Sequence, residues 1–358
     1  MKILYDYPAL SQTHGGVSRY ICGIIEQLDP EVKIDMSILF TDNIYIKNSQ
    51  FPKIGPFFIK NDFKGKIKLE KILNSLYANY KIIRNSYDIF HATYSDPYFL
   101  LKPKKPIVVT IHDMINEMVP EYKKSHAKHI ESKKKLIYSS TQIITVTENT
   151  KKDLLQLYPV DPNKITVIHH GAPAPATKIL KNEFGKYLLY VGRRSRYKNF
   201  RLFVEAISTL LLEDKNLKLV CVGQPFDLNE ATFLEQLGIS QQVQALSVSD
   251  DLLYSLYRHA VVFIFPSIYE GFGIPILEAF ANNCPVCLSH SSCFPEIAGN
   301  AAIYFDPEDK ISILQSVQKV ITDKTLSSEL IKLGSERLSM FTWKKAAQQT
   351  ADVYRKTI

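Results

Sequence analysis

The stretch "YLLYVGRRSRYKNFRLFVEAISTLLL", Tyr187 to Leu212, determines the fold class of this chain. Its opening residues, Tyr187–Val191, are apolar and of strand length, and they end at Gly192. A cationic loop follows, and Phe200–Leu212 then has the apolar spacing of an amphipathic helix. A short buried strand that passes through a glycine loop into a helix is the repeating unit of a parallel α/β sheet.

The alternation of short strands and helices extends over the whole chain and predicts the α/β class. Strands are expected at Lys2–Tyr7, Ile34–Phe40, Ile89–Ala92, Ile107–Ile111, Gln142–Val146, Ile165–Ile168, Tyr187–Val191, Leu217–Val222, Val243–Leu246, Val261–Phe265, Pro285–Ser289 and Ala302–Phe305. Helices are expected at Val17–Leu28, Leu69–Asn85, Lys128–Ser140, Glu148–Leu157, Phe200–Leu212, Asp250–Arg258, Pro275–Ala281 and Ile311–Asp323.

Two domains are expected, because 358 residues exceed what one ordinary core holds. The stretch "GAPAPATKILKNEFGKY", residues 171–187, alternates proline and alanine, which suits neither a helix nor a central strand. We therefore predict a first domain at 1–171, a linker at 172–186 and a second domain at 187–341. Ligands of open parallel sheets bind beyond the carboxyl ends of the strands, so two facing sheets would present their glycine loops to one cleft.

The net charge of +8 comes partly from three lysine runs in the first half of the chain. One interpretation is a solvated face. The other is a surface attracted to anionic lipid or a polyanionic substrate, since each cation near such a surface gains about 1 kcal/mol. A nucleic-acid partner is not favoured, because no interleaved aromatic side chains accompany the runs. The runs are Lys60, Lys64, Lys66, Lys68 and Lys71; Lys102–Lys105; and Lys133–Lys135.

A cytoplasmic location is expected from three features of the sequence. The five cysteines are an odd number in a large chain, which fits reduced thiols better than a disulfide framework. The apolar runs are strand-sized and fall short of the roughly 20 residues that span a bilayer. The start of the chain, "MKILYDYPAL", contains Asp6 and Pro8 where a secretory signal requires an unbroken apolar stretch.

The stretch "SIYEGFGIPILEAF", Ser267–Phe280, has one glutamate before an expected helix and another about one turn inside it. The backbone of Gly271–Ile274 leads into the helix N-terminus, where free N–H groups favour anions and sugar hydroxyls. A carboxylate accepts hydrogen bonds well from the paired hydroxyls of a sugar or ribose. Taken alone, the pair also fits a structural role, with Glu270 as a helix cap and Glu278 on a wet face.

The loop "GRRSRYKN" adds a cluster of cations at the carboxyl end of an expected strand. Arginine and lysine side chains are both suited to phosphate oxygens, so the loop favours an anionic ligand over a merely solvated surface. The cations are Arg193, Arg194, Arg196 and Lys198.

Together, "YEGFGIPILEAFANNCPV" and "LLYVGRRSRYKNF" resemble the retaining glycosyltransferases of the GT-B fold, specifically family 4. The resemblance covers nearly the whole chain and includes "HGGVSRY", "VVTIHDMINEMVPEYK" and "FTWKKAAQQTADVY". It implies two facing Rossmann-like domains with parallel sheets: an acceptor-side domain at 1–171 and a nucleotide-sugar-binding domain at 187–341. It also implies that a C-terminal helix, at 342–358, crosses back to the first domain.

The resemblance also implies roles for individual residues, because the family's two glutamates with seven intervening residues fall on Glu270 and Glu278. Glu270 would contact the donor sugar and Glu278 the nucleotide ribose, while Arg193 and Lys198 would hold the diphosphate. His112 would lie at the catalytic centre. The backbone groups that would help to bind the donor are Gly15, Gly16, Gly271, Phe272, Gly273 and Ile274.

No metal or other cofactor is expected, since cations and the helix dipole would stabilise the leaving diphosphate. The stretch "CPVCLSHSSC" offers Cys284, Cys287, His290 and Cys293 at metal-like steps, but an odd step along a strand sends side chains to opposite faces. Buried thiols are therefore favoured over a zinc site. The chain departs from the family at 282–285, where Asn-Asn-Cys-Pro replaces the usual Cys-Gly-Thr-Pro.

The expected function is transfer of a hexose, with retention, from a nucleoside diphosphate sugar to a saccharide or lipid-linked saccharide in cell-surface polysaccharide synthesis. "HDMINEMVPEYK" is similar to stretches in mannosyltransferases of O-antigen and capsule assembly, which favours GDP-mannose over a UDP-hexose. Peripheral contact with the inner face of the cytoplasmic membrane is expected. The alternatives are a nucleotide-sugar epimerase or hydrolase, and a non-catalytic partner in a polysaccharide assembly complex.

Overall fold

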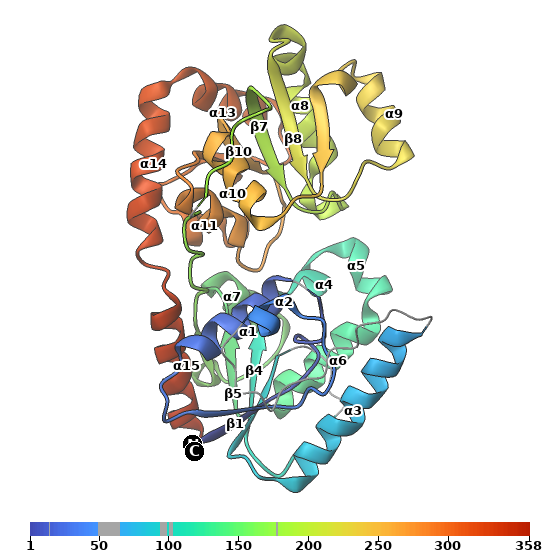
Figure 1. The fold of residues 1–358 in the computed structure, drawn as a ribbon, viewed down its shortest axis with the longest axis vertical. Helices are drawn as coiled ribbons and strands as arrows, with labels where there is room; N and C mark the ends of the chain where they lie inside the picture. Colours follow the sequence, from blue (N-terminus) through green and yellow to red (C-terminus); the bar gives the residue numbers. More distant parts are fainter. Residues whose placement is uncertain (14, 49–64, 94–98, 100–102, 177) are drawn as a thin grey trace. The chain divides into compact units, whose positions relative to one another are not determined.

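The computed structural model describes residues 1–13, 15–48, 65–93, 99, 103–176 and 178–358, and these form two compact units (Figure 1). The first unit contains Met1–Gly171 and Phe341–Ile358, and the second contains Ala172–Met340. Each unit has a parallel sheet between helices, so the expected α/β class with two Rossmann-like sheets is confirmed. Among the described residues, no helix is long and apolar enough to cross a membrane.

The sheet of the first unit has the order β2-β1-β3-β4-β5-β6, with parallel pairing throughout. Its strands are β1 (Lys2–Tyr5), β2 (Lys33–Met36), β3 (Ile89–Ala92), β4 (Ile107–Ile111), β5 (Gln142–Thr145) and β6 (Ile165–Val167). The helices of this unit are α1 (Gly16–Gln27), α2 (Ile44–Asn48), α3 (Lys66–Arg84), α4 (Ile115–Met118), α5 (Pro120–Ser125), α6 (Ala127–Ser139), α7 (Glu148–Leu157) and α15 (Trp343–Thr357).

The sheet of the second unit has the order β12-β11-β10-β7-β8-β9 and is also parallel. The direction of strand addition reverses between β7 and β10, which is where open parallel sheets bind ligands. The strands are β7 (Lys186–Val191), β8 (Leu217–Val222), β9 (Val243–Leu246), β10 (Val262–Phe265), β11 (Val286–Ser289) and β12 (Ile303–Phe305). The helices are α8 (Phe200–Glu213), α9 (Leu228–Gln236), α10 (Asp250–His259), α11 (Ile274–Ala281), α12 (Phe294–Ala298), α13 (Lys310–Thr322) and α14 (Lys324–Leu338).

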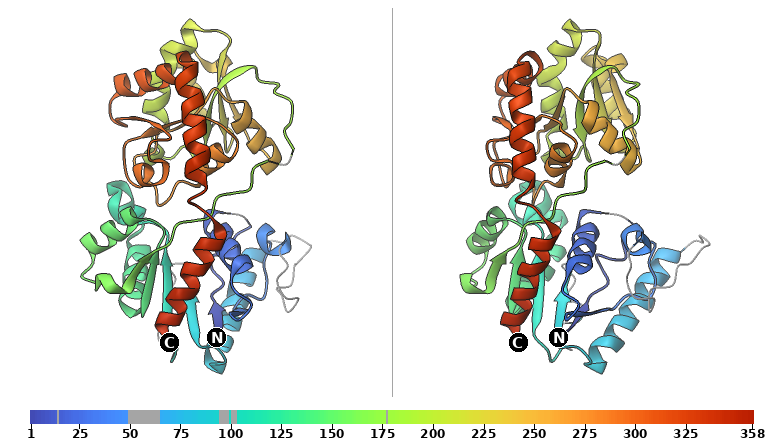
Figure 2. Two further views of the ribbon diagram at one scale, coloured as in Figure 1. Left: turned by 90° about the vertical axis from the view of Figure 1, so that its left-hand side faces the viewer. Right: turned by 60° about the vertical axis from the view of Figure 1, so that its left-hand side comes forward.

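The C-terminal helix α15 packs in the first unit, beside α1 and the sheet (Figure 2). A Cβ atom added at Gly23 of α1 would lie 2.7 Å from the indole of Trp343, so glycine is what permits this close approach. Farther along α15, the Tyr354 hydroxyl lies 2.5 Å from the Tyr5 hydroxyl and 2.6 Å from Nδ1 of His91. These buried contacts join the end of the chain to β1 and β3.

Two expected elements end differently in the structure. β1 stops at Tyr5 because the chain turns: the carbonyl of Tyr7 accepts hydrogen bonds from the next turn. β2 covers Lys33–Met36 and does not reach Phe40. The amide of Phe40 donates to Oδ1 of Asn74 in α3, at 2.8 Å, which ties this segment to the helix.

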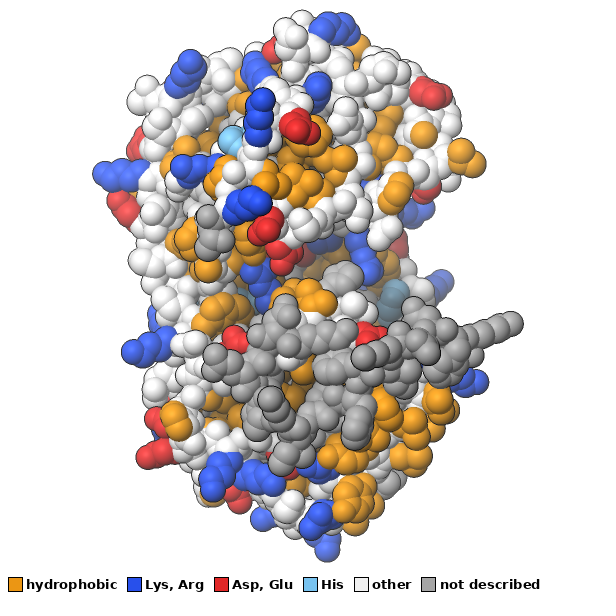
Figure 3. Space-filling view, viewed as in Figure 1, with side chains coloured by type: hydrophobic (Ala, Val, Ile, Leu, Met, Phe, Trp, Pro, Cys, Tyr) orange, Lys and Arg blue, Asp and Glu red, His pale blue; other side chains and the backbone are white. Residues whose placement is uncertain are grey.

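Helix α3 exposes a set of apolar side chains along its outer side (Figure 3). Its inner side is buried at Asn74, Ala78 and Ile82. Apolar residues therefore lie on both sides of this helix, whereas a surface helix usually has them only on the side that faces the core. The exposed ones on this side are Leu69, Ile72, Leu76, Tyr80 and Ile83.

Candidate active site

Two loops of the second unit meet at the carboxyl edge of its sheet. One follows β7 and the other follows β10, and these strands are parallel neighbours. The amide of Ile268 donates to the carbonyl of Tyr197 at 2.8 Å, which joins the loops through their backbones. Nζ of Lys198 lies 2.5 Å from Oε1 of Glu270. The structure thus brings together two residues that the sequence places 72 positions apart.

The ion pair of Lys198 and Glu270 is mostly shielded from solvent, with side-chain exposures of 13% and 14%. Burial opposes the charged ammonium, but the attraction of Glu270 and Tyr197 outweighs it, and the pKa of Lys198 is raised. The ammonium also lies 5.3 Å from the ring centre of Phe265, within cation–π range. This site therefore holds a permanent cation beside a hydrogen-bond acceptor.

The loop that carries Glu270 is held from behind by residues after β11. Oγ of Ser292 donates to the Glu270 carbonyl at 2.7 Å and accepts from the Glu270 amide at 3.2 Å. The thiol of Cys293 donates to the same carbonyl at 3.3 Å. Ser292 has a φ of 52°, which few residues other than glycine adopt. This support could not be predicted from the sequence, because no spacing signals the contact.

Glu278 lies inside α11, after a start that the sequence explains. Gly273 precedes the helix with a φ of 89°, and Pro275 occupies the first turn. The Glu278 side chain is buried, with 6% exposure, and accepts a hydrogen bond from the Tyr257 hydroxyl at 3.3 Å. The structural alternative that put Glu278 on a wet face is therefore wrong.

The backbone segment expected to bind the sugar forms the approach to α11. Gly271, Phe272 and Gly273 connect Glu270 to the first residue of the helix, Ile274. A Cβ atom at Gly273 would lie 3.0 Å from Ile276 and 3.2 Å from Phe294, so this turn is both left-handed and crowded. The helix N-terminus adds partial positive charge to the same place.

The cationic loop contains fewer available cations than the sequence suggested. Nε of Arg194 lies 2.7 Å from Oε1 of Glu230, and its Nη2 donates to the carbonyls of Gln224 and Pro225. Arg194 is thus a structural residue that joins the loop to α9. Arg193 and Arg196 are exposed, and within the described ranges neither forms an ion pair.

In the first unit, Gly15 and Gly16 form the start of α1, with Gly15 as its N-cap. His112 follows β4, and neither of its buried ring nitrogens has a hydrogen-bond partner among the described residues. Burial lowers the pKa of His112 to about 4, with Lys133 adding to the effect and Asp113 opposing it. The imidazole is therefore neutral at physiological pH, with one ring nitrogen able to accept a hydrogen bond and the other able to donate one.

The prediction that the lysine run Lys133–Lys135 lies on the surface is wrong for Lys133. It is buried and lies 2.9 Å from Oε2 of Glu117, and it also donates to the carbonyl of Asp113 at 3.0 Å. It holds the chain next to His112. Lys134 and Lys135 are less buried, while Lys60, Lys64 and Lys102 lie outside the described residues.

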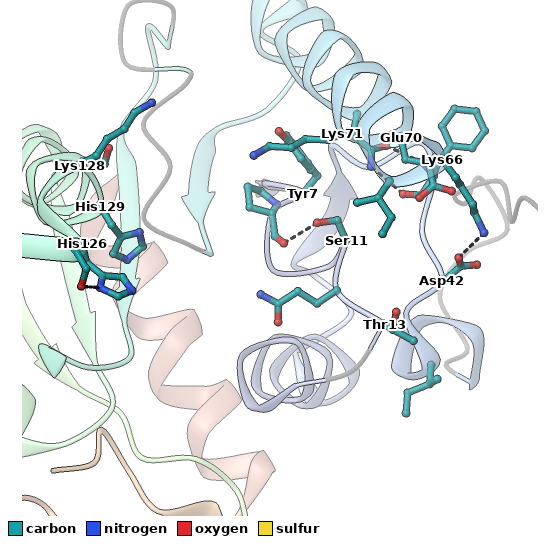
Figure 4. A pocket seen from close by; sticks show the side chains of 18 residues that line it. Tyr7, Ser11, Thr13, Asp42, Lys66, Glu70, Lys71, His126, Lys128 and His129 are labelled. Atoms are coloured by element: carbon teal, nitrogen blue, oxygen red, sulfur yellow. Dashed lines mark hydrogen bonds and ion pairs between the residues drawn. The ribbon is translucent and has the colours of Figure 1, made fainter. Parts of the chain in front are cut away.

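A cavity of about 1110 Å³ lies in the first unit, between the loop after β1, the start of α3 and the junction of α5 and α6 (Figure 4). His126, Lys128 and His129 line one side, and Lys66 and Lys71 line the other. Because polar and cationic side chains line this cavity, it is suited to a hydroxylated or anionic ligand.

The cysteines of the expected strand Pro285–Ser289 and its flanks are buried thiols, as expected: Cys284, Cys287 and Cys293. Within the part of the chain that the structure describes, no three His, Cys, Asp or Glu side chains gather as metal ligands.

Comparison with known proteins identifies sequence families in both units. Glycosyltransferase Family 4 matches residues 14–174, and Glycosyl transferases group 1 matches residues 176–337. The O-antigen chain mannosyltransferase B of Escherichia coli is 25% identical over 99% of this chain and 100% of its own length. The O-antigen chain mannosyltransferase RfbU of Salmonella typhimurium is 32% identical over 50% of each chain.

The fold is also similar to that of a solved structure, Anabaena HepE in complex with UDP and glucose. The TM-score is 0.76 at 15% sequence identity, over 99% of this chain and 100% of that one. The two families together span nearly the whole chain; one match contains β2 to β6 of the first sheet and the other contains all six strands of the second. The chain therefore belongs to the family 4 glycosyltransferases of the GT-B fold, and it is a glycosyltransferase similar to O-antigen mannosyltransferases.

Proposed function

We propose that this enzyme transfers a hexose, with retention, from a nucleoside diphosphate sugar to a hydroxyl of a saccharide or lipid-linked saccharide in cell-surface polysaccharide synthesis. Mannose from GDP-mannose is the favoured donor, and the names of the two O-antigen mannosyltransferase relatives support it. A UDP-hexose is the second choice, supported by the UDP and glucose held by HepE.

The observation that carries this proposal is the contact between Lys198 and Glu270 at the point where the second sheet reverses its strand order. A bound donor would replace this pair with two better-matched contacts. The diphosphate would take the Lys198 ammonium, and sugar hydroxyls would donate to the Glu270 carboxylate. Glu278 would accept from the ribose hydroxyls, and Arg193, which is exposed, would add a second cation to the diphosphate.

The chemical step that we propose is displacement on the face of the sugar from which the diphosphate departs. The bond from the anomeric carbon to the phosphate oxygen breaks, the bond to the acceptor oxygen forms, and the acceptor proton passes to the departing phosphate oxygen. Negative charge grows on the diphosphate during this step, so Lys198 and Arg193 stabilise the transition state more than the bound donor. Neutral His112 orients a sugar hydroxyl and carries no proton between reactants.

The location that we propose is the cytoplasm, with peripheral contact at the inner face of the cytoplasmic membrane. Its support is the lysine content of the first half of the chain, where Lys68 and Lys71 are exposed. Attraction of this kind is reversible and weakens with salt.

A panel of nucleotide sugars tests the donor. A donor that binds the folded protein raises its apparent melting temperature by mass action, and GDP-mannose is expected to give the largest shift. Transfer from the best donor to a lipid-linked saccharide should follow, with little free sugar formed when the acceptor is omitted. Release of free sugar or of an epimer without acceptor would favour the hydrolase or epimerase alternative. Absence of a shift with every nucleotide sugar would contradict the proposal.

A further inference from the structure

The outer side of α3 is a continuous apolar stripe, which we define as Leu69, Ile72, Leu76, Tyr80 and Ile83. These residues follow one another at steps of three and four, so they share one face of the helix. Their exposures are 43%, 49%, 63%, 52% and 66%. Single exposed apolar residues are ordinary, but a contiguous row of five along one helix marks a contact surface.

The stripe cannot turn inward, because the opposite face of α3 is fixed to the first unit. The Asn74 side chain receives hydrogen bonds from the amides of Leu39 and Phe40 at 2.9 and 2.8 Å and donates to the Phe40 carbonyl at 2.8 Å. Nζ of Lys81 lies 2.7 Å from Oδ1 of Asp35, at the end of the helix. The helix is therefore anchored over its length, and the exposed stripe is a stable feature of the folded unit.

The charges beside the stripe are predominantly positive. Lys66 and Lys81 are neutralised by Asp42 and Asp35, but Lys68 and Arg84, on the two flanks of the stripe, are exposed. Glu70 is the one acidic residue in the sequence of this helix. Figure 3 shows apolar and basic side chains together along the lower right of the molecule, where α3 runs in Figure 1.

We propose that the stripe of α3 docks the first unit on an anionic lipid bilayer, with the helix lying in the plane of the headgroups. Apolar side chains would enter the boundary of headgroups and acyl chains, and Lys68 and Arg84 would contact anionic headgroups. The same cations disfavour a second copy of this chain as the occupant, since its α3 would bring like charges against them.

The docking helix also lines the cavity of the first unit. Its first turns contribute Lys66, Ile67, Glu70, Lys71 and Asn74 to the cavity wall. A membrane-bound α3 would therefore hold the cavity at headgroup level, within reach of the head of a lipid-linked saccharide. This last consequence rests on the proposed function, whereas the docking surface itself does not.

Vesicle flotation of the full chain tests the docking surface. The parent protein should float with vesicles that contain phosphatidylglycerol, should bind phosphatidylcholine vesicles far less, and should lose binding as salt rises. The double variant Leu76→Glu/Ile83→Glu should partition about tenfold less or worse, since it places charge in the stripe. A matched control, Leu228→Glu/Ile311→Glu, alters two apolar residues of the second unit that are 87% and 64% exposed, and it should float like the parent.

Two further measurements separate failure of this inference from failure of the proposed function. The nucleotide-sugar melting shift should be the same in the parent and in the stripe variant, because neither substitution touches the donor residues. Vesicle binding with no shift for any nucleotide sugar would leave the docking surface correct and the function wrong. A parent that does not bind anionic vesicles, or a stripe variant that binds as well as the parent, would overturn the inference. Self-association of the parent that the variant lacks would equally overturn it, in favour of a second copy.

Discussion

Lys198 and Glu270 neutralise each other at 2.5 Å, and Lys198 is the residue expected to have the largest effect on turnover. Lys198→Met should lower kcat about a hundredfold or more, the usual cost of removing one stabiliser of developing charge. Arg196→Met, which changes an exposed cation of the same loop, should reduce kcat by less than about threefold. Steady-state transfer kinetics measure both. Equal effects of the two substitutions would show that general positive charge matters and the ion pair does not.

Glu278 should contribute to the affinity for the nucleoside diphosphate. Glu278→Ala removes a buried acceptor of charge-assisted hydrogen bonds, so affinity for the free nucleoside diphosphate should fall about ten- to a hundredfold. Tyr257→Phe removes only the hydroxyl 3.3 Å from this carboxylate and should weaken affinity much less. Titration calorimetry compares the two variants with the parent. A Glu278→Ala protein that binds the nucleotide as tightly as the parent would refute the assigned role.

Among elements, α15 depends on glycine at its contact with α1. Gly23→Ala should destabilise the first unit, because the new Cβ would lie 2.7 Å from the Trp343 indole. Alanine is intrinsically the better helix former by about 1 kcal/mol, so a loss of stability can come only from this collision. Thermal unfolding should give a lower melting temperature than for the parent, and adding Trp343→Ala should make the Gly23 substitution harmless. A single variant that melts at or above the parent temperature would contradict this packing.

The elements of the sheets could be predicted from the sequence better than those at the surface. Strands such as β10, Val262–Phe265, are buried on both faces and therefore read as unbroken apolar runs. α14, Lys324–Leu338, was not predicted, because Leu330 and Gly334 are its fully buried residues and its apolar period is weak. The outer stripe of α3 was likewise not separated from its buried face, since both are apolar in sequence.

Only the residues of the site that belong to local sequence motifs could be predicted. The spacing of Glu270 and Glu278 is local and visible in the sequence, and their assigned functions remain predictions that the substitutions above test. The pairing of Arg194 with Glu230 and the support of Glu270 by Ser292 join residues 36 and 22 positions apart. Such contacts depend on which loops lie at the same edge of a sheet, and the periodic pattern of apolar residues in the sequence does not reveal this.

At the scale of the whole molecule, three buried histidines make stability depend on pH. Burial lowers the pKa of His91 to about 3 and of His112 to about 4, and it lowers the pKa of His170 well below its usual value. The unfolded chain, with a histidine pKa near 6.5, then binds more protons than the folded chain below this pH, so acid destabilises the fold. Between about pH 7.5 and pH 5.5 each histidine should cost about 1.4 kcal/mol.

Urea unfolding at a series of pH values, followed on the parent and on His91→Gln, checks this expectation. The parent should lose free energy of unfolding steadily as the pH falls below about 6.5, and the variant should have a shallower slope because one of the three titrations is gone. A free energy of unfolding that is independent of pH across this range would mean that the histidines are not buried as neutral groups.

The proposed reaction of this chain is transfer of a hexose, with retention, from a nucleotide sugar. The most direct test is the NMR spectrum of the product formed from GDP-mannose and a saccharide acceptor, read for the configuration of the new anomeric carbon. We expect an α-linked mannose, the configuration of the donor, formed by the parent and about a hundredfold more slowly by Lys198→Met. A β-linked product, or a product that forms equally fast in the Lys198 variant, would contradict it.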